Sequence, residues 1–530
     1  MKIKQALISI LALLCFFGNN SYASGGDQHK IRGFMIDAPR GVETMNYYFR
    51  LIDFLHAKHF NTVIFRLTDD QGSAYLFKSH PELKMCEGAF TPEELKKMVR
   101  YAADIGIEMI PEIESFGHAR YITETEKYRL LNDGPPGEDF NAISPVSEDA
   151  YSLMKDLYTE IASIFPGRYI HIGCDEVNWG AGELSKKALA SASKAEIWSH
   201  YVNKLNGFLK TMDKTTIIWG DVPIYHEKEI LEMLDKDIVI MDWNYRQSDK
   251  IQIKNVAARV LDHGFKLIGS PAVHWCEWSA RVGASQFKNI NAYTEVYAAL
   301  DNPNNMGIIL TNWVPTRYLQ NSEWDIYAIA AAIVNNNGNY NYMDAIPDFV
   351  KDHFGAAYDA GWETIFKTVY EGAFQTPACG KVDSLKFSPW SSAEDIRDII
   401  TKNRRIQKKF DGVTRQLTAY RDNITRNKDD FEDFVLAIRF LNYNYNRQNT
   451  LLDFFQSRKN DMAAVQAYLK RVASEDQVQL SSICAAWKRG RHYKPDEALK
   501  NCMSAFYKAA EYSNHLSENP KLFMEILNGK

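Results

Sequence analysis

The chain has 530 residues, of which 45% are hydrophobic and 24% charged, proportions that are ordinary for a globular protein. Its length predicts one large domain together with a second one. The formal net charge of -5 is small, and no run of lysine and arginine stands out. Composition therefore gives no reason to expect a nucleic acid as partner.

The first 23 residues predict a signal peptide. A short basic start precedes the apolar stretch ALISILALLCFF, and the segment ends at Ala23 in the small-x-small pattern of a cleavage site. The apolar stretch is too short for a stable anchor, and no later segment reads as a membrane span. A lipoprotein cleaved at Cys15 is the alternative, although the large Leu14 precedes it. We expect an exported protein, periplasmic or extracellular.

From residue 31 onward, short β-branched runs alternate with amphipathic stretches. The expected strands are 31–37, 62–67, 107–114, 169–173, 215–221, 238–243, 265–271 and 306–313. The expected helices are 45–59, one that opens at Thr91, 147–164, 193–212, 226–236, 251–263, 288–300 and 324–335. Eight strand–helix repeats predict an α/β fold, a closed (β/α)8 TIM barrel over residues 24–340. An open doubly wound sheet is the alternative, but it rarely needs eight units.

The strand signal disappears beyond the barrel, and residues 341–530 are expected to form an all-helical C-terminal domain. Its expected helices are 345–373, 393–424, 428–457, 460–473 and 495–513. The cysteines that follow the signal peptide are scattered and show no metal-binding spacing. Cys484 with Cys502 is the favoured disulfide by proximity, and buried free thiols are the equal alternative.

Carboxylates and tryptophans recur at the C-terminal ends of the predicted strands. They are Asp37, Asp69, Asp70, Glu112, Glu114, Asp175, Glu176, Trp219, Asp221, Asp242, Trp243, Trp275, Glu277 and Trp313. Any one of them could cap a helix or plug the barrel, but functional residues of such barrels gather at this rim. Stacking surfaces with paired acids describe a sugar-cleaving site. No metal-binding, P-loop or nicotinamide motif is present, so neither a metal nor a cofactor is expected.

Asp175 and Glu176 are direct neighbours in the sequence. Ordinary retaining glycosidases place two carboxylates on opposite faces of the sugar, roughly 5–5.5 Å apart. Neighbouring acids suit the substrate-assisted variant better, in which the 2-acetamido oxygen of the sugar is the nucleophile. One acid then protonates the leaving group, and the other orients the acetamide N–H.

The segment HIGCDE (171–176) resembles the strand-four motif His-x-Gly-Gly-Asp-Glu of glycoside hydrolase family 20, the β-N-acetylhexosaminidases. Motifs similar to those of the family's first, second, third and fifth strands are RGFMIDAPRG (32–41), LTDDQG (67–72), PEIESFGHA (111–119) and WGD (219–221). The resemblance spans residues 31–335. It implies a retaining exo-β-N-acetylhexosaminidase that releases terminal β-linked GlcNAc or GalNAc from a glycan.

The resemblance also implies a role for each matching residue. Glu176 corresponds to the general acid/base and Asp175 to the carboxylate that orients the acetamide. His118 corresponds to the histidine that contacts the acid/base, backed by Asp69, which we favour, or by Asp70. The remaining residues are expected to bind the sugar: Arg32 through its hydroxyls, Trp219 and Trp313 as pocket walls, and Asp221, Trp243, Trp275 and Glu277 at the rim.

The chain departs from the family pattern at three places. Cys174 replaces the second glycine of the strand-four motif. The tyrosine expected after strand seven has no counterpart in SPAVHWCEW (270–278), and Pro315 stands where a glutamate is expected after strand eight. Two alternatives therefore stay open: a barrel that binds glycans without cleaving them, and a glycosidase of altered specificity, for example for a modified or sulfated hexosamine.

Overall fold

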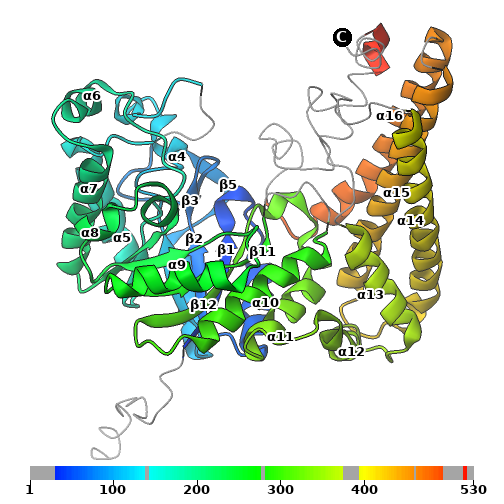
Figure 1. The fold of residues 1–530 in the computed structure, drawn as a ribbon, viewed down its shortest axis with the longest axis horizontal. Coiled ribbons are helices and arrows are strands. Elements are labelled where there is room, and N and C mark those ends of the chain that lie inside the picture. Colours follow the sequence, from blue (N-terminus) through cyan, green and yellow to red (C-terminus); the bar gives the residue numbers. More distant parts are fainter. Residues whose placement is uncertain are drawn as a thin grey trace, which may run out of the picture. The chain divides into compact units, whose positions relative to one another are not determined.

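A closed parallel barrel forms the first part of the computed structural model (Figure 1), which describes residues 30–137, 142–275, 281–373, 393–458, 461–492 and 517–521. The strand order is β1-β2-β6-β7-β8-β9-β10-β12, and β12 pairs with β1 to close the ring. The bounds are β1 (Ile31–Asp37), β2 (Thr62–Arg66), β6 (Glu108–Glu112), β7 (Tyr169–His171), β8 (Thr215–Trp219), β9 (Val239–Asp242), β10 (Lys266–Gly269) and β12 (Asn305–Asn312). The predicted TIM barrel is confirmed.

Helices follow the strands and cover the outside of the barrel (Figure 1). The long ones are α2 (Met45–Ala57), α3 (Pro92–Asp104), α5 (Glu148–Ala162), α7 (Lys194–Lys210), α9 (Lys250–Asp262), α10 (Ala284–Ala299) and α11 (Trp324–Asn335). Short helices stand between them: α4 (Arg120–Thr123), α6 (Glu183–Leu189) and α8 (Ile230–Met233). Thr91 and Glu94 form a capping box at the start of α3, which satisfies two backbone N–H groups there.

The strands bury side chains on both faces because each faces the barrel interior on one side and helices on the other. Alternate positions fill the interior, which holds Met35, Ile64, Ile110, Ile217, Val239, Met241, Ile268 and Ile309. The positions between them, such as Phe34 and Val63, pack against the helices. The barrel is therefore a packed core, and a ligand can enter only at its mouth.

Three features of the barrel differ from the prediction. The predicted helix 226–236 is reduced to α8, because a π-helical turn, η3 (Val222–His226), precedes it. A small separate sheet of β3 (Thr68–Asp69), β4 (Gly72–Tyr75) and β5 (Met85–Phe90) follows the second barrel strand. An additional strand, β11 (Ala272–His274), pairs with β12.

Helices alone make up the described part of the chain after the barrel, as predicted. They are α12 (Ile346–Phe349), α13 (Ala360–Ala373), α14 (Ala393–Tyr420), α15 (Lys428–Arg458) and α16 (Met462–Trp487), with the turn η7 (Val350–Phe354) after α12. The predicted helix 495–513 and Cys502 lie outside the described residues, so the Cys484–Cys502 disulfide stays a prediction. No helix in the described ranges has the length and apolar character needed to cross a bilayer.

Candidate active site

The alternation of side chains along the strands carries polar groups to the mouth of the barrel. Four strands end in an inward-facing residue: Asp37 on β1, Arg66 on β2, Glu112 on β6 and Trp219 on β8. Each stands two positions after a residue of the inner core, so it occupies the same face one step nearer the C-terminal end. This end of the barrel is where ligands of such folds bind.

Arg66 is the centre of this polar layer, and its side chain is fully buried. Its Nη2 lies 2.6 Å from Asp69 Oδ2 and 3.0 Å from Glu114 Oε1. Its Nη1 lies 3.5 Å from Glu112 Oε1. Burial raises the pKa of Glu112 to about 7 even with this guanidinium beside it. Arg66 was not among the predicted site residues, although it stands three positions before Asp69 at the end of a strand.

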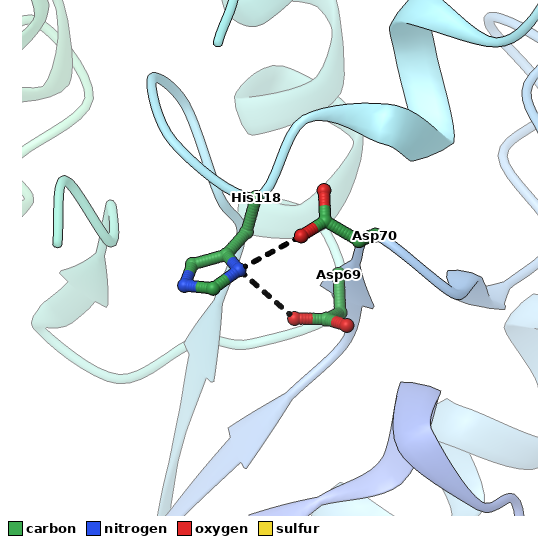
Figure 2. Close-up of side chains that lie close together, drawn as sticks. All are labelled: Asp69, Asp70 and His118. Atoms are coloured by element: carbon green, nitrogen blue, oxygen red, sulfur yellow. Dashed lines mark hydrogen bonds and ion pairs between the residues drawn. The ribbon is translucent and has the colours of Figure 1, made fainter. Parts of the chain in front are cut away.

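His118 lies between residues that follow the second and the fourth barrel strands, and Figure 2 shows its contacts with Asp69 and Asp70. Its Nδ1 lies 3.0 Å from Asp70 Oδ2 and 3.6 Å from Asp69 Oδ2. Its Nε2 lies 3.6 Å from Asp175 Oδ2 and 3.5 Å from Glu176 Oε2. The ring therefore stands between the aspartates of one loop and the two adjacent acids.

The favoured partner of His118 has to be corrected. Asp70 forms the hydrogen bond with the imidazole, and Asp69 lies farther away at ion-pair distance; Figure 2 marks both contacts. The shorter ion pairs of Asp69 are with Arg66 and with Arg40, whose Nη2 lies 2.8 Å from Asp69 Oδ2. Two arginines thus neutralise Asp69, and Asp70 is left to bind the histidine.

The charges of His118 and Asp175 stabilise each other. Burial opposes the protonated ring, but Asp175 and Asp70 raise the pKa of His118 well above its ordinary value. Burial likewise opposes the ionised form of Asp175, yet the imidazolium holds the pKa of this carboxyl well below its usual range. The structure thus places a stable carboxylate next to the second acid, Glu176.

Asp175 and Glu176 occupy different environments although they are neighbours. The side chain of Asp175 is 7% exposed and that of Glu176 48% exposed. The backbone separates them: Cys174 has a φ of 76° and Glu176 a φ of 46°, both in the left-handed region. One acid is consequently held inside the site, and the other is open to a group that arrives from solvent.

Asp221, predicted to bind substrate, lies beneath this pair. Its Oδ2 accepts a hydrogen bond from the Glu176 N–H at 2.9 Å. Burial raises the pKa of Asp221 to about 8, and the charge of Asp175 adds to the effect. The structure therefore shows Asp221 supporting the backbone of Glu176.

Aromatic side chains form one wall of the mouth. Trp219 Nε1 donates to Glu112 Oε1 at 2.9 Å, and its ring lies 5.6 Å from that of Trp313. Trp313 Nε1 donates to Tyr245 Oη at 2.7 Å. The Tyr245 ring stacks on Trp243 at 5.0 Å and lies 5.7 Å from Trp275. The four predicted tryptophans are thus brought together.

Tyr245 is a residue of this wall that the sequence reasoning missed. It stands three positions after the end of β9, beyond the strand-end residues that were considered. Its phenolic oxygen accepts the Trp313 N–H, and the same hydroxyl is also a donor. Glu277, predicted to lie at the same rim, falls outside the described residues.

Arg32 is at the wrong end of the barrel to contact a sugar at the mouth, so this prediction is wrong. It begins β1, and its Nε donates to His59 O at 2.9 Å. Arg40, which follows the same strand, is the arginine of the mouth. Its guanidinium lies 3.4 Å from Asp37 Oδ2 and 5.3 Å from the centre of the Trp313 ring.

Asp69, Asp70 and His118 have ligand atoms within 4.8 Å of one another, a spacing that could hold a metal ion. Two arginines already pair with the carboxylate of Asp69. A cation would also compete with the positive charge that Asp175 and Asp70 stabilise on His118. The donor set therefore fits a histidine held between carboxylates better than it fits a metal ion.

Comparisons with known proteins identify the family of the barrel. The model of "Glycosyl hydrolase family 20, catalytic domain" matches residues 29–312. A β-hexosaminidase of Vibrio furnissii is 28% identical over 253 residues, 41% of this chain and 40% of that protein. The β-hexosaminidase subunit beta of Homo sapiens is 26% identical over 207 residues, 36% of this chain and 37% of that protein. The chain thus spans about two fifths of the length of these relatives.

Solved structures share the fold. The GH20 exo β-N-acetylglucosaminidase of Vibrio harveyi has a TM-score of 0.50 at 20% identity, covering 61% of this chain and 57% of that one. The β-N-acetylhexosaminidase of Bacteroides fragilis NCTC 9343 also has a TM-score of 0.50 at 20% identity, covering 61% of this chain and 69% of that one. At this identity the likeness concerns the barrel architecture.

Proposed function

This chain belongs to glycosyl hydrolase family 20, and we propose on that basis that it removes terminal β-linked N-acetylhexosamine from glycans, acting at chain ends with retention of configuration. The observation that carries the proposal is the environment of the two adjacent acids. His118 Nε2 lies within 3.6 Å of both Asp175 and Glu176, and only Glu176 is open to solvent. Two carboxylates with different exposure on one side of a site suit two different tasks.

In the first step Glu176 donates its proton to the glycosidic oxygen as the bond from that oxygen to the anomeric carbon breaks. The 2-acetamido oxygen of the same sugar attacks the anomeric carbon, and an oxazolinium ring forms. Asp175 accepts a hydrogen bond from the acetamide N–H, and its negative charge stabilises the developing positive charge. The low pKa that His118 gives Asp175 keeps this carboxylate ionised for the task.

In the second step the carboxylate of Glu176 takes a proton from water, and the water oxygen attacks the anomeric carbon. The oxazolinium ring opens, the acetamide is restored, and the β-configuration is retained. His118 orients both acids from a fixed position, because Asp70 holds its other ring nitrogen.

The aromatic wall and Arg40 supply the binding groups. Trp219 and Trp313 offer faces on which a sugar ring can stack. We infer that Tyr245 supplies the phenol for the acetamide oxygen, since it lies in the aromatic wall between Trp243 and Trp275 and SPAVHWCEW after the seventh strand has no tyrosine. Arg40, in place of Arg32, is the arginine available for sugar hydroxyls.

We also propose that the protein is exported, to the periplasm or outside the cell. The support is the basic and apolar start of the chain with its cleavage pattern at Ala23. Detection of the mature N-terminus by mass spectrometry of fractionated cells tests this: a protein that retains residues 1–23 in the cytoplasm contradicts it.

The activity is tested with aryl β-GlcNAc, aryl β-GalNAc and aryl β-glucoside, each with and without a GlcNAc-thiazoline. Cleavage of an N-acetyl substrate that the thiazoline blocks is the expected result, because this inhibitor mimics the cyclised acetamide. Glu176→Gln is the matched inactive variant. Cleavage of the glucoside that the thiazoline leaves unaffected would instead identify a glycosidase of altered specificity, and binding without any cleavage a lectin-like barrel.

A further inference from the structure

The segment that follows α16 returns to the mouth of the barrel. Gly490 O accepts a hydrogen bond from the Thr44 N–H at 2.9 Å, and the His492 N–H donates to Val42 O at 3.2 Å. Between these bonds Glu43 and Arg491 form an antiparallel bridge. Residues 490–492 thus lie antiparallel to residues 42–44 of the loop that joins β1 to α2, through this isolated bridge and its two flanking hydrogen bonds.

Arg491 contacts two different loops with one guanidinium. Its Nε donates to Glu43 Oε1 at 2.8 Å, and its Nη2 donates to the carbonyl oxygen of Pro315. Its guanidinium lies 3.9 Å from the centre of the Trp487 ring, which orients it from behind. Gln320 Nε2 donates to the other oxygen of Glu43 at 2.8 Å. Glu43 and Arg491 are both buried, so water competes little for these bonds.

Each of the two loops carries a residue of the proposed sugar pocket. Arg40 stands three positions before Glu43, and Trp313 two positions before Pro315. Between Trp313 and Pro315, Val314 adopts a φ of 52°, which is unfavourable for a β-branched residue. Its N–H donates to Asp37 Oδ2 at 2.9 Å. A strained loop of this kind keeps its conformation only where its surroundings hold it.

We propose that Arg491 is a positioning residue of the active site: it fastens the loop of Arg40 to the loop of Trp313, so the C-terminal helical part completes the pocket for the terminal sugar. The inference rests on the proposed function. It gives the helical part a role in binding, separate from the acids. His118 is held by Asp70, Asp175 and Glu176, and the Glu176 backbone by Asp221, whereas Arg491 contacts the loops that follow β1 and β12.

Kinetics of Arg491→Met and Arg491→Lys on aryl β-GlcNAc test the proposal. Arg491→Met is expected to raise KM and the thiazoline inhibition constant by about tenfold to a hundredfold, as small misplacements of binding groups do, with kcat changed only a few-fold. Arg491→Lys is expected to fall between this variant and the wild type, because an ammonium can pair with Glu43 but cannot also reach Pro315 in the same geometry. If Arg491→Met does not fold, the KM of Arg491→Lys alone tests the positioning role of Arg491.

Arg489→Met is the matched control. Arg489 lies in the same segment and pairs with Asp433 on α15, with no bond to either loop of the pocket. Its loss is expected to leave KM unchanged. Wild-type KM and inhibition constants in the Arg491 variants overturn the proposal, and so does an equal rise of KM in Arg489→Met, which would assign the effect to docking of the helices in general.

Hydrogen–deuterium exchange separates this inference from the proposed function. In Arg491→Met, amide exchange in residues 38–44 and 313–320 is expected to increase at least tenfold relative to Arg489→Met, while the barrel strands keep wild-type protection. Such an increase supports the positioning role of Arg491 even if the wild type cleaves none of the aryl substrates. The lack of cleavage would contradict the proposed function alone. Unchanged amide exchange in both segments overturns the positioning role of Arg491.

Discussion

At the scale of single residues, Asp221 shows how a carboxylate at the mouth can be structural. It accepts the backbone N–H of Glu176 and lies beside Asp175. In the folded protein the pKa of Asp221 is about 8, far above the ordinary aspartate value of 3.8. Between these two values the folded protein holds one more proton than the unfolded chain, so the free energy of unfolding contributed by this group falls as pH rises.

The stability of the Asp221→Asn variant relative to the wild type is therefore expected to increase as pH increases. The amide accepts the same hydrogen bond and does not titrate, so the melting temperature of the variant minus that of the wild type should grow by a few degrees between about pH 5 and pH 8. Thermal unfolding across this range measures it. A difference that is constant with pH would mean that the carboxyl titrates alike in both states.

Tyr245 gives the second prediction at this scale. Tyr245→Phe keeps the ring that stacks on Trp243 but removes the hydroxyl proposed to bind the acetamide oxygen. We expect kcat/KM for aryl β-GlcNAc to fall about 10²-fold, as for other preorganised donors. Tyr101→Phe, which removes a hydroxyl bonded to Asp53 between two outer helices, is the control and should change little. Equal kcat/KM in both variants would remove Tyr245 from substrate binding.

The sequence identified the types of residue at the site better than their individual positions. The choice between Asp69 and Asp70 depends on which aspartate Arg66 and Arg40 occupy, and Arg40 comes from the end of another strand. Arg32 and Arg40 flank the same strand, but only the second follows its C-terminal end. Tyr245 could have been found by extending the search a few residues beyond the strand end.

At the scale of elements, the barrel strands were predictable because each is a continuous apolar run, as burial on both faces requires. The expected strand 31–37 and β1 coincide. The three-stranded sheet after β2 was missed because β3 contains only two residues, too few to show alternation. Helix α16 was expected over 460–473 and extends to Trp487, since its polar middle weakens the amphipathic pattern while tertiary packing continues the helix.

The turn after β7 positions the two acids, and it has no room for a side chain at Gly173. Gly173 has a φ of +72°, and a Cβ there would lie 1.9 Å from Glu114 Oε2. Gly173→Ala is therefore expected to cost about 2–5 kcal/mol of unfolding free energy, from the left-handed backbone and the overpacking together. Urea unfolding measures it.

Gly106→Ala is the control for the backbone contribution alone. Gly106 has a φ of +84° with nothing within 4 Å of the added Cβ, so its loss should cost only about 1–2 kcal/mol. Equal costs for the two variants would show that Glu114 moves aside without penalty, and that the turn tolerates a side chain.

At the scale of the whole molecule, two buried aspartates of α15 attach the helical part to the barrel. Asp430 at the start of α15 accepts from Arg50 on α2 at 2.6 Å and lies 3.0 Å from His353 Nε2. Asp433, one turn later, accepts from Asn321 at 3.2 Å. These contacts sit on the side of α2 and η5 (Gln320–Ser322), so they join the two parts away from the catalytic acids.

Asp430→Asn is expected to lower the unfolding free energy by about 1–3 kcal/mol, because it removes a buried charge that faces Arg50 and His353. KM should stay at the wild-type value. Glu432→Gln on the same helix removes an exposed pair with Arg421 and should cost no more than about 0.5 kcal/mol. Denaturant unfolding of both variants measures the difference. Similar costs would mean that Asp430 contributes no more than a surface pair.

The return of residue 491 to the barrel mouth also has a consequence for synthesis of the chain. About 180 residues separate Trp313, near the end of the last barrel strand, from Arg491. At roughly 5–20 residues per second, the ribosome needs on the order of 10–40 seconds to add them. During this interval the barrel can assemble with its acids in place while the loops of Arg40 and Trp313 are still unfastened. In a nascent chain the catalytic acids would thus be in position before the sugar-binding pocket is complete.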